Sequence, residues 1–107
     1  MEMVETSVLI EDLIEELNLL ERHLQILQLL SKEGPAGIMK LSQITGIPPH
    51  RVRYSLRILE NEKMIVASPE GAKIIGDINS FLDNLKFGIS QIEKRINEIK
   101  ELLNSFK

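Results

Sequence analysis

The chain has 107 residues, of which 43% are hydrophobic and 27% charged, and it contains no cysteine. These proportions are ordinary for a folded, soluble protein with one modest core. The lack of cysteine excludes disulfides, thiolate catalysis and cysteine-ligated metal centres, and it suits a reducing compartment. Because neither a signal peptide nor an apolar run long enough to span a bilayer is visible, we expect a cytoplasmic protein with no membrane partner.

The net charge of −3 is unevenly distributed along the chain. Residues 1–33 contain eight acids and two bases, a net charge of −6. Residues 34–76 contain six bases and three acids, a net charge of +3, and residues 77–107 contain five of each. Salt screens exposed charges beyond about 8–10 Å, so an anionic partner responds to the local surface and not to the total. The middle third is therefore the predicted binding region for such a partner.

An amphipathic helix is predicted from about Thr6 to Lys32. Apolar residues recur there at three- and four-residue spacing, with acids between them, as on one face of a helix. They are Ile10, Leu13, Ile14, Leu17, Leu20, Leu24, Leu27 and Leu30. Thr6 or Ser7 can cap the start, and Gly34-Pro35 ends the helix. Asn18 leaves open a break into two helices.

Glycine and proline punctuate the middle of the chain. Gly37–Met39 is predicted as a short extended stretch, and Leu41–Thr45 as a short helix with Leu41 and Ile44 facing the core. Gly46 supplies a tight turn, and Pro48-Pro49 opens a helix that ends near Glu62.

Two short apolar runs follow that helix. Met64–Ala67 and Ala72–Ile75 are predicted as strands, and Ser68–Gly71 is the turn between them, so this stretch is expected to form a β-hairpin.

The last segment is predicted as one long helix capped by Asp77. Its apolar residues alternate gaps of four and three, the heptad pattern of a coiled-coil-like seam. They are Ile78, Leu82, Leu85, Ile89, Ile92, Ile96, Ile99, Leu103 and Phe106. Isoleucine at d positions and a repulsive match of Arg95 with Lys100 disfavour a parallel pair. We therefore expect a homodimer whose N- and C-terminal helices form one bundle, with Ile10, Leu13 and Leu17 contributing from the acidic first helix.

The order helix, short strand, helix, turn, helix and hairpin is that of a winged helix-turn-helix domain. The stretch LSQITGIPPHRVRYSLRILENEKMIVASPEGAKI resembles winged-helix transcription regulators of the MarR/ArsR/PadR-like kind, and the resemblance covers residues 20–76. It implies that Leu41–Thr45 is the second helix, Pro49–Glu62 the recognition helix and Ile65–Ile75 the wing. One departure is Lys63, which stands where these proteins usually have a glycine in the left-handed conformation.

The expected fold class is thus mainly α, a winged helix-turn-helix with a small hairpin wing. Residues 1–19 are the predicted N-terminal dimerisation helix, residues 20–76 the DNA-binding domain, and residues 77–107 the C-terminal coiled-coil-like dimerisation helix.

The predicted recognition helix has an apolar and a basic face. The apolar face has the i, i+3, i+4, i+7 spacing of Val52, Ser55, Leu56 and Leu59. Arginines on the opposite face can bond guanine or phosphate bidentately, and lysines on the neighbouring elements can contact the backbone. The predicted DNA contacts are His50, Arg51, Arg53, Tyr54, Arg57, Lys40 and Lys73. An alternative for Arg53 and Arg57 is pairing with Glu60 or Glu62 within the chain.

The predicted function is sequence-specific binding of double-stranded DNA as a homodimeric transcription regulator. No nucleophile–base set or phosphate loop is visible, so an enzyme is not expected. His23 and His50 are the only histidines, and we expect no metal site and no cofactor. The alternative is a protein-interaction module in which the winged domain docks a partner and the terminal helices assemble the complex. A small-molecule effector is left open.

Overall fold

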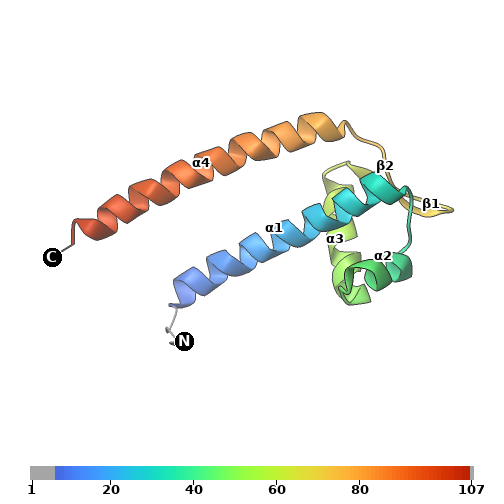
Figure 1. Ribbon diagram of the computed structural model, residues 1–107, viewed down its shortest axis with the longest axis horizontal. Coiled ribbons are helices and arrows are strands. Elements are labelled where there is room, and N and C mark those ends of the chain that lie inside the picture. The colour runs from blue at the N-terminus through green and yellow to red at the C-terminus, as the bar shows by residue number, and fades with distance from the viewer. Residues whose placement is uncertain (1–6, 107) are drawn as a thin grey trace. The chain divides into compact units, whose positions relative to one another are not determined.

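The computed structural model describes residues 7–106, and the chain divides into two compact units, one ending at Gly76 and one beginning at Asp77. The first unit comprises helices α1 (Val8–Glu33), α2 (Ile38–Thr45) and α3 (Pro49–Asn61), and strands β1 (Ile65–Ser68) and β2 (Gly71–Ile74) (Figure 1). The second unit is one long helix, α4 (Ile78–Asn104). In the part of the chain that the structure describes, no helix is both long and apolar enough to cross a membrane.

α1 is one continuous helix of 26 residues. The Ser7 side chain caps its start by accepting a hydrogen bond from the Ile10 N–H at 3.3 Å. Gly34, with φ of 83°, ends it by donating its N–H to the Leu30 carbonyl at 3.0 Å. The helix runs through Asn18 without a break, so the alternative of two separate helices is wrong.

The connection from α1 to α2 differs from the prediction. Ile38 and Met39 are helical residues of α2, so an extended Gly37–Met39 is wrong. The extended residue is Ala36, which exchanges two backbone hydrogen bonds with Ala72 at 3.1 and 2.9 Å. The next residue, Gly37, already belongs to the start of α2, since its carbonyl accepts from the Leu41 N–H at 3.0 Å.

The hairpin is antiparallel, with Ile65 paired to Ile74 and Ser68 paired to Gly71. Gly71 has φ of 113°, and a Cβ on it would overlap the backbone of Ala36. A glycine at this position therefore lets the Ala36 segment approach closely enough to bridge to β2, and the wing is tied to the helical part of the domain.

The core of the first unit is aliphatic. Its fully or almost fully buried apolar side chains come from α1, α2, α3, β1 and the connection between α1 and α2. They are Ile26, Leu27, Leu30, Ala36, Leu41, Val52, Leu59 and Ile65. The predicted inward face of α3 is largely confirmed, since Val52, Ser55 and Leu59 are buried and Leu56 is half-buried. Ile44 is 51% exposed, so its predicted inward position is wrong. It lies at the rim of a shallow groove of about 290 Å³ between α1 and α2.

The turn between α3 and β1 contains Lys63, whose φ of 62° makes it the one non-glycine residue with positive φ among residues 7–106. The left-handed geometry that usually has a glycine at this position is therefore kept here with a lysine. The tight turn places the Met64 N–H 3.1 Å from the Leu59 carbonyl and leads directly into β1.

α4 begins at its predicted cap, where the Asp77 carboxylate accepts from the Ser80 N–H at 3.1 Å. Its heptad positions lie on one face of a single 27-residue helix. From the middle of the helix onward these side chains are exposed, namely Ile89, Ile92, Ile96, Ile99 and Leu103. An ion pair joins Arg95 to Glu98 at 3.0 Å, and both side chains are exposed, so it contributes little to stability.

Candidate nucleic-acid interface

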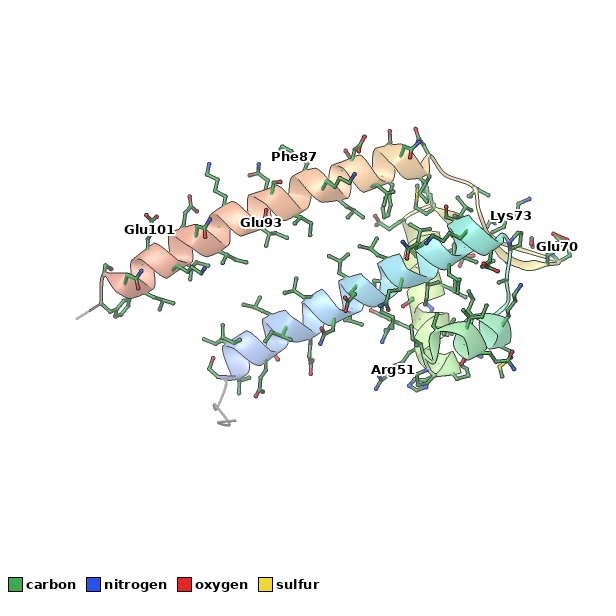
Figure 2. The ribbon with its side chains drawn as sticks, in the orientation of Figure 1. Arg51, Glu70, Lys73, Phe87, Glu93 and Glu101 are labelled. Atoms are coloured by element: carbon green, nitrogen blue, oxygen red, sulfur yellow. The ribbon has the colours of Figure 1, made fainter. Side chains whose placement is uncertain are left out.

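The seven residues predicted to contact DNA are all exposed. Five lie on α3, and the other two are Lys40 on α2 and Lys73 on β2. Figure 2 shows Arg51 on α3 and Lys73 on the hairpin. The apolar side of α3 is buried and its basic side is open, as the sequence predicts.

Two arginines of α3 line a groove beside the hairpin. Arg53 and Arg57, with Leu56 and Glu60, form one wall, and residues 65–68 with Gly71 and Ala72 form the other. The groove has a volume of about 370 Å³. Within residues 7–106 neither arginine is paired with Glu60, Glu62 or another acid. The alternative of internal pairing is therefore not seen there, and both guanidinium groups keep their donors for a ligand.

The other side of α3 faces α1 through a buried serine. Ser55 is 0% exposed, and its hydroxyl oxygen accepts from Arg22 Nε at 3.0 Å. His23 Nδ1 lies 2.7 Å from the same oxygen. A neutral imidazole with its proton on Nε2 accepts the serine proton at Nδ1, whereas the other tautomer donates to the serine oxygen. Burial, and then the neighbouring Arg22 charge, lower the pKa of His23 and favour the neutral form.

Tyr54 lies beside this cluster. Its ring centroid is 5.9 Å from the Arg22 guanidinium carbon and 5.9 Å from the His23 ring centroid. The first contact has the geometry of a cation–π interaction. Tyr54 is still 41% exposed, so it is held from one side and open to solvent on the other.

Arg22 and His23 are neighbours of the open face that the sequence pattern does not reveal. They precede Ser55 by 33 and 32 residues, and no local periodicity connects them. The available signal was Ser55 itself, because a hydroxyl at a predicted buried position requires a hydrogen-bond partner. The fully buried serine cannot reach a substrate, so its contact with His23 is structural and not a nucleophile–base pair.

No group of three or more histidine, cysteine or acidic residues within the described residues could hold a metal ion.

The residues predicted to mediate dimerisation lie on two helices, α1 and α4. On α1, Ile10, Leu13 and Leu17 are 47%, 62% and 50% exposed. On α4, the stripe begins with Ile78, Leu82 and Leu85 and continues through the exposed positions named above.

Comparison with known proteins gives a match over the helices that carry the open basic face. Residues 21–65 match the family described as bacterial regulatory protein, arsR family. That range runs from the second half of α1 to the first residue of β1.

A second similarity is to a probable cytoplasmic tyrosine–tRNA ligase from Enterocytozoon bieneusi (strain H348). The two sequences are 33% identical over an alignment 112 residues long, gaps included, which covers 94% of this chain and 32% of that protein. The chain thus spans about a third of that relative's length, whereas the arsR-family match coincides with the helices that carry the open basic face. The first unit therefore has the winged helix-turn-helix fold, and the similarity of residues 21–65 to the arsR family of bacterial regulatory proteins supports DNA-binding transcription regulation.

Proposed function

We propose that the protein is a homodimeric transcription regulator that binds double-stranded DNA sequence-specifically in the cytoplasm. The observation that carries the proposal is the open side of α3. There, Arg53 and Arg57 have no acidic partner among residues 7–106, and Lys73 is exposed on the neighbouring strand. The family match does not cover three parts of the proposal: the homodimer, the sequence specificity and the individual residues that contact DNA.

The dimensions of the parts suit a duplex. An α-helix with its side chains is about 10–12 Å across, and the major groove is about 12 Å wide. With α3 in the groove, Arg53 and Arg57 offer bidentate bonds to guanine or phosphate. His50 and Arg51 lie in the first turn, where recognition helices usually read base edges. Lys40 and Lys73 contact the backbone and set the register.

The two exposed apolar faces support the dimer. Ile10, Leu13 and Leu17 give α1 one such face, and the stripe of α4 gives another. The acidic first helix complements the bases of α4 in charge, so the N- and C-terminal helices of two copies can form one bundle. A two-fold dimer then reads half-sites about one helical turn apart, roughly 34–36 Å.

The test removes the two arginines together. The double variant Arg53→Ala/Arg57→Ala should lose about 100-fold or more in affinity for a selected duplex, because each bidentate contact contributes about 1–3 kcal/mol. Circular dichroism and sedimentation should show unchanged helix content and assembly, since both side chains are exposed. Lys32→Ala, which removes an exposed base of α1, is the matched control. Unaltered DNA affinity in the double variant would show that α3 does not read DNA.

The competing function is a protein-interaction module, which the net charge of −6 over residues 1–33 favours. In that case the winged domain docks a protein, and affinity for duplex DNA is not measurable. The similarity to a tyrosine–tRNA ligase makes structured RNA the appropriate competitor in each binding experiment.

A further inference from the structure

We infer that the DNA-binding surface extends from α3 onto α1, and that Arg22 is a phosphate-binding residue held ready by Ser55 and Tyr54. The inference rests on the proposed function. Arg22 lies outside the residues that the sequence pattern singles out as DNA contacts.

The two sides of α3 have different neighbours. Arg53 and Arg57 line the groove beside the hairpin. Ser55 and Tyr54 contact α1 through Arg22 and His23. Successive residues of a helix are about 100° apart, so Tyr54 lies at the edge of the open face that borders α1, and Ser55 lies beyond it on the buried side of α3. A helix in the major groove has a phosphate strand along each edge. The hairpin can contact one phosphate strand of the duplex, and α1 can contact the other.

Arg22 is anchored in a way that leaves its outer nitrogens available. A guanidinium has five N–H donors, and the one on Nε is used by Ser55 at 3.0 Å. The four donors on the two Nη atoms remain. Within residues 7–106 the guanidinium is not paired with an acid. Its carbon lies 5.9 Å from the Tyr54 ring centroid, which restricts the side chain further.

The anchored fork fits a phosphate better than a base edge. Two Nη groups side by side match two oxygens of one phosphate. Because Arg22 projects from α1 and not from α3, it can reach the phosphates at the border of the DNA major groove but not the base edges at its floor. It is one of two bases in α1, and the other, Lys32, lies beside the shallow groove shared with α2. The two residues therefore form a matched pair: each is a single charge on the same helix, but they have different surroundings.

The experiment measures the affinity of the full chain for a labelled duplex as a function of salt. Removing one phosphate contact should lower the magnitude of the slope of log K against log salt by about 0.9. We expect this change, with an affinity loss of about three- to tenfold at low salt, for Arg22→Gln. Arg22→Lys, which keeps the charge, should retain the slope and lose only part of the affinity. Lys32→Gln should leave both quantities unchanged.

A second variant separates anchoring from charge. Ser55→Ala frees the Arg22 fork but keeps its charge, so the slope should stay at the wild-type value while affinity falls. Circular dichroism must show a folded domain for each variant. An unchanged slope in Arg22→Gln, or an equal change in Lys32→Gln, overturns the inference and leaves DNA binding by α3 intact. A wild-type chain with no salt-dependent affinity for DNA overturns the proposed function as well.

Discussion

The two halves of α1 carry the same apolar repeat, yet only one half is buried. In the second half, Ile26 and Leu27 are 0% and 1% exposed, whereas in the first half Leu13 and Leu17 are 62% and 50% exposed. In Figure 1 the first half extends beyond α2 and α3. The comparison shows that a repeat specifies a helix and its apolar side, while burial depends on what lies opposite. Under the proposed function, a second copy covers the first half.

The largest expected difference between the halves is in core stability. Leu27→Ala should lower the free energy of unfolding by about 2–5 kcal/mol, because it leaves a cavity that neighbouring side chains only partly fill. Leu13→Ala should lower it by less than about 1 kcal/mol in dilute solution, where a second copy is absent. Urea denaturation at two protein concentrations measures both. Equal losses in dilute solution would mean that the first half is buried within the chain.

A second difference concerns assembly. Leu17→Lys should weaken dimerisation about tenfold to a hundredfold, since burying one large apolar side chain contributes about 1.5–3 kcal/mol. Asn18→Lys adds the same charge at the next position, off the apolar stripe, and should leave the dissociation constant nearly unchanged. Sedimentation velocity reports both constants. A wild-type chain that is monomeric at micromolar concentration would refute the dimer.

Sequence patterns predicted the parts of the fold that depend on local spacing. The two faces of α3 and the Asp77 cap each follow from residues within a few positions of one another. The same holds for the exposure of Arg53, since the basic residues simply occupy the side opposite Val52 and Leu59.

The parts that sequence patterns missed depend on distant partners. The bridge of Ala36 to Ala72 joins segments 36 residues apart, so neither neighbourhood reveals it. Ile44 has suitable spacing to face the core but lies half-exposed at the rim between α1 and α2. The contacts of Arg22 and His23 with Ser55 arise only when α1 packs on α3.

A third difference is a titratable contact: His23, in the second half of α1, lies within hydrogen-bond distance of Ser55 on α3. The lowered pKa of His23 means that the unfolded chain takes up this proton first as the pH falls. The contribution of His23 to stability is therefore complete above the unfolded value of about 6.5, and it is lost as the pH falls from there through the lowered folded value. His23→Asn keeps a side chain that can form a hydrogen bond with Ser55 but does not titrate.

The measurement is the difference in unfolding free energy between wild type and His23→Asn across this pH range. The stability of wild type relative to the variant should decline as the pH falls below about 6.5. His50→Asn, which removes the exposed histidine of α3, is the control. A constant difference across the range would show that the His23–Ser55 contact does not depend on a neutral imidazole.

The smallest expected effect is at the start of α1. Ser7→Ala removes the side-chain cap of the Ile10 N–H, which typically costs about 0.5–1 kcal/mol of local helix stability. Because the first half has no partner in the winged domain, the loss should appear as fraying in hydrogen exchange of residues 8–14 and not as a shift of the core transition. A shift of the core transition would mean that α1 unfolds as one unit.

Under the proposed function, the open side of α3 binds the phosphates and bases of a duplex. The most direct test of this binding is the affinity of the wild-type chain for double-stranded DNA across a range of salt concentrations. DNA binding by α3 predicts a steep linear fall of log K with log salt, with a slope of about −0.9 for each phosphate contacted. Affinity that is absent at low salt, or that does not change with salt, would contradict it.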